Sequence, residues 1–272
     1  MEAVKMEIRE HKGPFAVYLL LRTLVILTMI LQLFNRNYEN VFLCLLTLFL
    51  LIVPSIIQVD FKVELPTTLE IILLLFIFCA EILGETQSFY LRFPMWDTVL
   101  HTLNGFIAAA IGFSLVDLMN RDPRIHFQMS PLFVAIVAFC FSMTIGVIWE
   151  FFEFFMDRFA GLDMQKDTII HGFTSVALDP TRQNIPIAVE NIHDVIINGR
   201  SLGVGGYIDI GLFDTMNDLL VNFAGALLFS IFGYFYVKNR GKGSFVKRFI
   251  PRRKDKNRDY KELLLRKQQE EG

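Results

Sequence analysis

The stretch PLFVAIVAFCFSMTIGVIWEFFEFFMD, residues 131–157, decides the fold of this chain. From Pro131 it runs for 19 residues without a charged side chain and then reaches Glu150. A helix needs about 20 mostly apolar residues to cross a bilayer, and proline is well placed in the first turn of a helix. The stretch therefore predicts a membrane-spanning helix that begins near Pro131 and carries Glu150, Glu153 and Asp157 toward its end.

Five further stretches have a similar length and composition, so we predict an all-α polytopic membrane protein, a bundle of six transmembrane helices. The chain is 53% hydrophobic and 20% charged, with a mean hydropathy of +0.45. The first apolar run is too long for the core of a cleaved signal peptide, so we expect it to remain as a helix. The three cysteines lie within apolar runs, which favours packing over a disulfide framework. The predicted spans are Phe15–Phe34, Tyr38–Ile57, Thr67–Gly84, Asp97–Val116, Pro131–Phe155 and Asp214–Val237.

The chain divides into a transmembrane domain and a basic tail. Residues 1–237 contain the six predicted helices, and residues 238–272 form the tail, which contains 13 of the 26 Lys and Arg residues. Residues 158–212 form one long loop between the fifth and sixth helices. Turn signals such as Asn198-Gly199, together with many β-branched residues, predict a small cap with short strands or surface helices in this loop.

Lysine and arginine are unevenly distributed between the two sides of the bundle. With six spans both termini share a side, which holds 19 Lys and Arg residues against six on the opposite side. Because cytoplasmic loops carry the excess of positive charge, we expect a multi-pass cell-membrane protein with both termini in the cytoplasm. The long loop is then extracytoplasmic, and so are the polar ends of the third to sixth helices.

Acidic and polar side chains gather at that extracytoplasmic end of four helices. Within each helix they stand three or four residues apart, a spacing that places them on one face. Ionisable groups beside the hydrocarbon are costly and point to a functional site, and converging carboxylates need shared protons, a cationic side chain or a metal ion. A divalent Mg, Mn, Ca or Zn ion suits oxygen ligands with one imidazole. The candidate metal ligands are Glu81, Glu85, Asp97, His101, Glu150, Glu153, Asp157, Asp214 and Asp218.

Three members of this set are also the candidate catalytic residues: Glu150, Glu153 and His101. Carboxylate and imidazole groups serve as metal ligands or as the general base that activates a nucleophile. Polar side chains without a charge in the same stripes, and the loop that follows the fifth helix, supply groups that would contact a substrate. The candidate substrate-binding residues are Asn104, Asn222, Gln165 and Asp167.

Simpler structural roles are open for several of these residues. Asp97 and Asp214 stand where N-caps of the fourth and sixth helices would be. Glu85 and Asp157 are compatible with solvated helix ends, and His101 with a hydrogen-bonded histidine inside the bundle. Glu150 and Glu153 stand between aromatic and aliphatic residues, so such roles explain them least well.

The tail predicts a contact with the membrane surface. Basic clusters next to a membrane helix bind anionic lipid headgroups, at about 1 kcal/mol per residue near the surface. We therefore expect the bilayer and its anionic lipid as partners, and we expect no nucleic acid; no protein partner is indicated. The cluster comprises Lys247, Arg248, Arg252, Arg253, Lys254 and Lys256.

Short polar and glycine motifs mark the ends of helices three to six. They are Gly84-Glu85, Trp96-Asp97, Leu100-His101, Asn104-Gly105, Trp149-Glu150, Glu153, Asp157, Asp214-Thr215, Asp218-Leu219, Asn222 and Gly225. Together, over roughly residues 67–237, they resemble the YjdF-like family of bacterial polytopic membrane proteins, a family without an assigned function. A weaker similarity is to VanZ-like proteins, which are associated with tolerance of glycopeptide antibiotics; this chain has two extra N-terminal spans and a longer outer loop. The resemblance implies that the polar residues form one site, and it implies no reaction.

Three classes of function remain open from the sequence. The first is a metal-dependent enzyme that acts on a lipid or a lipid-linked envelope precursor at the outer leaflet. The second is a transporter of a cation or a lipid, which would need access from both sides of the membrane, whereas the polar stripes lie in the outer half. The third is a non-catalytic membrane scaffold or sensor that holds a partner through the long loop and the tail.

Overall fold

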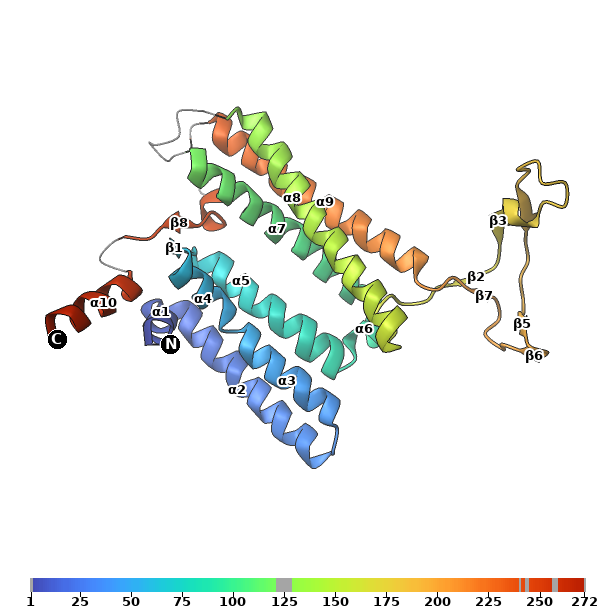
Figure 1. Ribbon diagram of the computed structural model, residues 1–272, viewed down its shortest axis with the longest axis horizontal. Coiled ribbons are helices and arrows are strands. Elements are labelled where there is room, and N and C mark those ends of the chain that lie inside the picture. Colours follow the sequence, from blue (N-terminus) through green and yellow to red (C-terminus); the bar gives the residue numbers. More distant parts are fainter. Residues whose placement is uncertain (1, 121–128, 240, 243–244, 256–258, 272) are drawn as a thin grey trace. The chain divides into compact units, whose positions relative to one another are not determined.

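The computed structural model describes residues 2–120, 129–239, 241–242, 245–255 and 259–271 (Figure 1). Within these residues, six helices are long and apolar enough to cross a membrane, which confirms the predicted all-α membrane fold. Their ends lie close to the ends predicted from the sequence. The spans are Lys12–Phe34, Tyr38–Asp60, Thr67–Thr86, Trp96–Asp117, Pro131–Ala160 and Leu212–Lys238.

The chain forms two compact units. The first comprises Met1–Thr144 and Val221–Gly272, and the second comprises Ile145–Leu220. Both boundaries fall inside helices, so α8 and α9 each contribute to both units. The helices are α1 (Glu2–Glu10), α2 (Lys12–Phe34), α3 (Tyr38–Leu50), α4 (Val53–Asp60), α5 (Thr67–Phe78), α6 (Phe89–Arg92), α7 (Trp96–Asn120), α8 (Pro131–Phe155), α9 (Leu212–Lys238) and α10 (Tyr260–Glu271).

In the first unit, α2, α3 and α5 lie side by side (Figure 1). Val25 of α2 and Cys44 of α3 are completely buried in the apolar cluster between them. The second span is divided into α3 and α4 beside Pro54, because proline lacks the N–H that would continue the helix. The end of the third span is not α-helical, because α5 is followed by a π-helix over Cys79–Thr86.

Glycine residues allow α7 and α9 to approach closely within the same unit. A Cβ atom added at Gly105 of α7 would lie 2.1 Å from the carbonyl oxygen of Asn222. One added at Gly225 of α9 would lie 2.0 Å from the carbonyl oxygen of Thr102. Ser142 of α8 donates a hydrogen bond of 2.7 Å to the carbonyl oxygen of Gly105. Small residues permit such close contact between the backbones of membrane helices. The apolar core of this unit includes Phe113, Val134, Ala138, Ala226 and Phe229.

The basic tail is folded back onto the first unit. The strand β8 (Arg252–Arg253) pairs antiparallel with β1 (Val63–Glu64). Lys254 forms a buried ion pair with Glu7 of α1. Lys256 lies outside the described residues. The tail therefore has specific contacts with the bundle, which its composition did not indicate, and its apolar residues reach the core at Val246, Phe249 and Ile250.

In the second unit the long loop consists of short paired strands. The turn between β5 and β6 is Asn198-Gly199, with φ of 50° and 80°. Positive φ at both central residues is typical of a type I′ hairpin turn, which Asn-Gly favours. A 3₁₀ turn covers Val176–Leu178. The antiparallel pairs are β2 (Ile169–Ile170) with β7 (Tyr207–Ile208), β3 (Phe173–Ser175) with β4 (Ile187–Val189), and β5 (Ile196–Ile197) with β6 (Arg200–Ser201).

Candidate metal site

Three carboxylates meet inside the second unit. They belong to Glu150 and Glu153 of α8 and to Asp218 of α9. Each offers one carboxylate oxygen, and the three oxygens lie within 4.8 Å of one another. All three residues are buried, with exposed fractions of 4%, 7% and 4%. This group, hereafter the carboxylate site, is the part of the predicted metal set that the second unit brings together.

The sequence of α8 explains why its two glutamates face inward. Glu150 and Glu153 are three residues apart and so share a face, while the aromatic residues between and beside them lie on the other faces. Phe151 and Phe152 are 58% and 44% exposed, as expected for side chains in contact with lipid. Trp149 donates a hydrogen bond of 2.9 Å from Nε1 to Oε1 of Glu153, which fixes the orientation of that carboxylate.

The geometry fits a divalent cation. Oxygen ligands bind Mg or Ca at roughly 2.0–2.6 Å, so two ligands of one ion stand at most about 5 Å apart. The three oxygens of the carboxylate site meet this limit. Buried carboxylates this close together do not all stay ionised unless a cation or shared protons compensate their charge. A metal ion held by Glu150, Glu153 and Asp218 is one arrangement that resolves the repulsion.

Asp157 holds the chain that leaves α8. It lies in the π-helical turn Met156–Ala160, and its two carboxylate oxygens accept hydrogen bonds from the backbone N–H groups of Met164 and Gln165. The chain reverses at Gly161, whose φ of +68° favours glycine. These contacts give Asp157 a structural role, and its role as a metal ligand stays a prediction.

The start of α9 is tied to the same loop segment. Oδ2 of Asp214 accepts a hydrogen bond of 2.7 Å from the backbone N–H of Lys166. Nε2 of Gln165 donates one of 2.6 Å to Oγ1 of Thr215. Asp214 is the third residue of α9 and not its N-cap. Gln165 therefore links loop and helix, and substrate binding by Gln165 remains a prediction.

Asp209 is a structural residue that the sequence analysis missed. It is 8% exposed and accepts hydrogen bonds from the backbone N–H groups of Thr168 at 2.7 Å and Phe213 at 2.8 Å. Burial alone would raise the pKa of Asp209, but the backbone donors outweigh it and hold the pKa below its ordinary value. An aspartate shortly before an apolar helix is the signal that would have found it.

Asp167, the other loop residue predicted to bind substrate, is exposed. Partial desolvation raises its pKa above the ordinary value, and the charges of Asp163, Asp209 and Asp157 add to this effect. The carboxylate therefore gains a proton more readily than a free aspartate does. Substrate binding by Asp167 stays a prediction.

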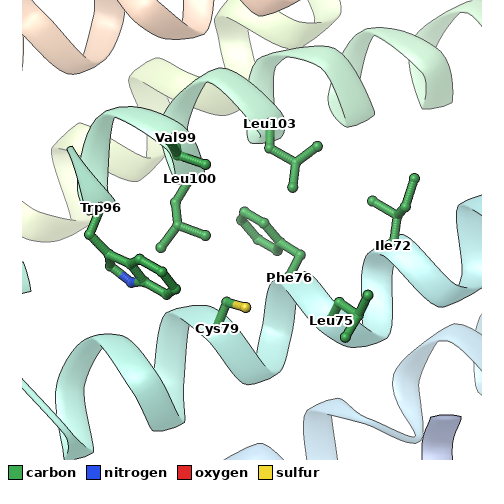
Figure 2. A pocket seen from close by; sticks show the side chains of 8 residues that line it. All are labelled: Ile72, Leu75, Phe76, Cys79, Trp96, Val99, Leu100 and Leu103. Atoms are coloured by element: carbon green, nitrogen blue, oxygen red, sulfur yellow. The ribbon is translucent and has the colours of Figure 1, made fainter. Parts of the chain in front are cut away.

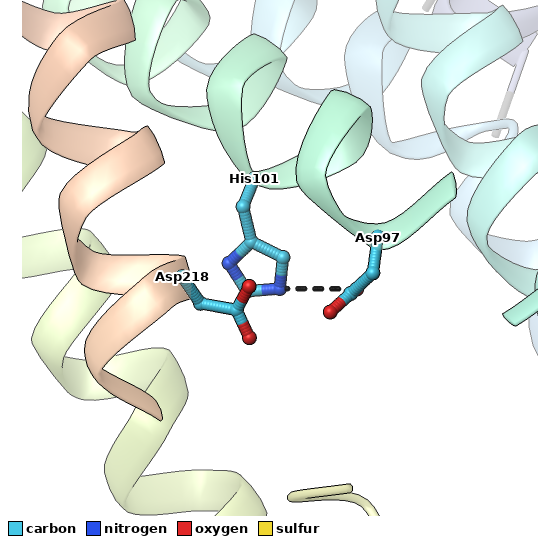
Figure 3. Close-up of side chains that lie close together, drawn as sticks. All are labelled: Asp97, His101 and Asp218. Atoms are coloured by element: carbon cyan, nitrogen blue, oxygen red, sulfur yellow. Dashed lines mark ion pairs between the residues drawn. The ribbon is translucent and has the colours of Figure 1, made fainter. Parts of the chain in front are cut away.

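On α7, in the first unit, Asp97 and His101 form an ion pair (Figure 3). Nε2 of His101 lies 3.4 Å from Oδ1 of Asp97, and His101 is 9% exposed. The helix begins at Trp96, so Asp97 stands in its first turn and not at the N-cap. A carboxylate beside one ring nitrogen orients the imidazole. Figure 3 also draws Asp218, which belongs to the second unit.

Asn104 and Asn222, the other two predicted substrate contacts, face each other within the first unit. Nδ2 of Asn104 donates a hydrogen bond of 3.2 Å to Oδ1 of Asn222. Asn222 is 1% exposed, and its own Nδ2 points to the sulfur of Met143 at 3.6 Å. The pair bridges α7 and α9 beside Gly105, which supports a packing role; substrate binding by either residue remains untested.

The third span holds Glu81 and Glu85, two of the predicted metal ligands. Both lie in the π-helical stretch Cys79–Thr86, where hydrogen bonds run from i to i+5. Glu85 is exposed and Glu81 half-buried. In the described part of the chain, the groups with metal-ligand separations do not include Glu81, Glu85, Asp157 or Asp214.

The sequence model of a family described as "Predicted membrane protein (DUF2238)" matches residues 17–239. An uncharacterized protein of Thermotoga maritima is 24% identical over 95 residues, which is 35% of this chain and 47% of that relative, so the match spans about half the relative's length. No solved structure matches. The resemblances to the YjdF-like and VanZ-like families stay predictions.

Proposed function

The chain belongs to the DUF2238 family of membrane proteins, and from this premise we propose that it is a metal-dependent enzyme of the membrane. Its substrate is a lipid or a lipid-linked envelope precursor, and the reaction takes place at the extracytoplasmic face. The observation that carries the proposal is the carboxylate site, three buried acids whose oxygens lie within 4.8 Å of one another in membrane-spanning helices. Such groups in a membrane protein mark a functional site by default.

In this proposal Glu150, Glu153 and Asp218 hold one divalent cation of the Mg, Mn, Ca or Zn class. A bound ion of this kind polarises a phosphoryl or carbonyl oxygen or lowers the pKa of a bound water. Trp149 keeps Glu153 in position through its 2.9 Å hydrogen bond. Helix bundles with inward carboxylates at this spacing are a recurrent way of building such sites.

His101 is the proposed general acid–base residue, with Asp97 as the group that orients its ring. The 3.4 Å contact between the two side chains supports this assignment. It also relies on the sequence argument that α7 begins at the membrane face where α8 ends. A histidine titrates near neutral pH and so exchanges a proton readily with a substrate group.

The extracytoplasmic location is supported by charge. The side with both termini carries 19 Lys and Arg residues, and the opposite side carries six. The exposed arginines Arg252 and Arg253 of the tail are the proposed contacts with anionic lipid on the cytoplasmic side. These basic residues would anchor the tail and take no part in the reaction.

Turnover by purified protein tests the proposal. The protein in detergent is incubated with a polyprenyl diphosphate and, separately, with a phospholipid, while phosphate release and fatty-acid release are measured. We expect EDTA to abolish turnover of one substrate, a divalent ion to restore it, and Glu150→Gln to reduce it at least a hundredfold. Glu190→Gln, an exposed site in the same unit, is the matched control. Metal-independent turnover, or full activity of Glu150→Gln, would overturn the proposal.

A further inference from the structure

An apolar pocket lies between α5 and α7 in the first unit (Figure 2). Its volume is about 210 Å³. The residues on both walls belong to membrane-spanning helices, so the medium available to fill the pocket is the bilayer. The lining includes Ile72 and Phe76 of α5, Cys79 at the start of the π-helix, and Trp96, Leu100 and Leu103 of α7.

Trp96 is the polar exception in this apolar lining. Its indole ring reaches into the space between the helices (Figure 2), and one edge packs against Phe89 with 5.0 Å between ring centroids. The Nε1 atom is buried and has no hydrogen-bond partner among the described residues. A buried N–H without an acceptor is costly, so the pocket is complementary to a ligand that brings an acceptor to this end.

The position of Trp96 along α7 narrows the choice of ligand. It is the first residue of the helix, at the level where indole rings of membrane proteins meet the lipid headgroups. From Trp96 to Leu103 the helix rises roughly 10 Å toward the bilayer centre. The pocket thus has a hydrogen-bond donor at the interface and only apolar side chains below it.

We propose that this pocket binds one acyl chain of a membrane lipid, with the ester carbonyl of that lipid accepting a hydrogen bond from Trp96. The ester carbonyl is a hydrogen-bond acceptor at the same depth in the membrane as the indole N–H of Trp96. The acyl chain is apolar, as are the side chains that line the pocket below Trp96. The wall at Cys79 is where α5 passes into the π-helix Cys79–Thr86. The inference rests on the membrane fold and not on the proposed metal enzyme.

Fluorescence quenching by a brominated lipid tests this site, because the chain has only two tryptophans. Trp149→Phe leaves Trp96 as the reporter, and Trp96→Phe leaves Trp149, which is 43% exposed, as a lipid-facing reference. Each protein in detergent micelles is titrated with a phosphatidylcholine brominated on one acyl chain. We expect quenching of Trp96 to saturate near one lipid per chain, while quenching of Trp149 rises without saturation.

Two substitutions of cysteine by phenylalanine locate the binding. Cys79→Phe fills the pocket and should raise the lipid concentration for half-quenching at least tenfold. Cys140→Phe adds the same bulk at an exposed position of α8 and should change nothing. Leu103→Phe narrows the pocket from the opposite wall and replaces Cys79→Phe if that variant does not fold.

A comparison of ester-linked with ether-linked lipid tests the proposed hydrogen bond from Trp96 to the lipid carbonyl. An ether-linked phosphatidylcholine has no ester carbonyl, so it should bind the Trp96 protein at least threefold more weakly than the ester lipid. The inference is overturned if Trp96 quenching follows the bulk lipid content as Trp149 quenching does. It is equally overturned if neither pocket-filling variant alters the titration. Retained metal-dependent turnover in Cys79→Phe would separate failure of this inference from failure of the proposed enzyme.

Discussion

The contact between α7 and α9 can be perturbed by one methyl group. Gly105→Ala would place a Cβ atom 2.1 Å from the carbonyl oxygen of Asn222, and Gly225→Ala would place one 2.0 Å from that of Thr102. Both obstacles are backbone atoms of the facing helix, so no side-chain rotation relieves the overlap. The two helices would have to separate by about 1.3 Å for the Cβ atom to reach an ordinary C···O contact distance of about 3.4 Å.

The expected loss of stability follows from two opposing effects. Overpacking of a well-packed interior costs typically about 1–3 kcal/mol, and the upper end applies here because backbone must move. Alanine is a better helix former than glycine by about 1 kcal/mol. We therefore expect each variant to lose about 2 kcal/mol of the free energy of unfolding. The double variant should lose less than the sum, since one separation of the helices relieves both overlaps.

Unfolding in detergent micelles, driven by increasing dodecyl sulfate and followed by circular dichroism, measures these losses. Gly13→Ala in α2 is the matched control, because its Cβ would lie 3.7 Å from the nearest side-chain atom of Thr67. It should be neutral or slightly stabilising. Unchanged stability of both Gly105→Ala and Gly225→Ala would refute the close contact, and strict additivity in the double variant would refute the shared separation.

Further predictions concern the tail, the loop and the orientation. Lys254→Met leaves Glu7 without its buried partner, which should destabilise tail docking by about 3 kcal/mol and speed tryptic cleavage at Arg252 and Arg253; unchanged cleavage would contradict the docked tail. Hydrogen bonds, first that from the Thr181 side chain, lower the pKa of Asp179 to about 2. Because this folded-state pKa is lowered, the contribution to loop stability is present above about pH 4 and lost as the pH falls toward 2, so amide exchange at Gln183 and Ile185 should accelerate over that range in wild type but be fast throughout in Asp179→Ala. In a chain with its cysteines replaced by alanine, Thr181→Cys should react with an impermeant maleimide on intact cells and Lys261→Cys should not; the reverse pattern would invert the proposed orientation.

The six spans could be predicted because each depends on local composition. A run of about 20 apolar residues has few alternatives to a membrane helix. The fifth span begins at Pro131 as predicted, and the sixth ends at Lys238, one residue beyond the predicted end at Val237. Spacing within one helix was equally informative, since Glu150 and Glu153 had to share a face. The inward orientation of both is confirmed by their burial.

The parts that sequence reasoning missed depend on contacts between distant residues. Nothing near Asp157 or Asp214 indicates that the backbone of residues 164–166 returns to bind their carboxylates. The ion pair of Glu7 with Lys254 joins residues 247 positions apart. Local sequence cannot reveal such a contact, so the tail was predicted as a free basic segment. The π-helix at Cys79–Thr86 was also not predicted, because apolar composition does not distinguish it from the end of an α-helix.

The metal content of the purified protein shows whether the carboxylate site binds an ion. Purified protein is equilibrated with Mg, Mn, Ca or Zn, dialysed, and measured by plasma mass spectrometry alongside Glu150→Gln, Asp218→Asn and the control Glu190→Gln. We expect close to one divalent ion per chain in wild type and in the control, and loss of that ion in both site variants. A folded wild-type protein that retains no ion, or site variants that retain it, would contradict a metal held by Glu150, Glu153 and Asp218.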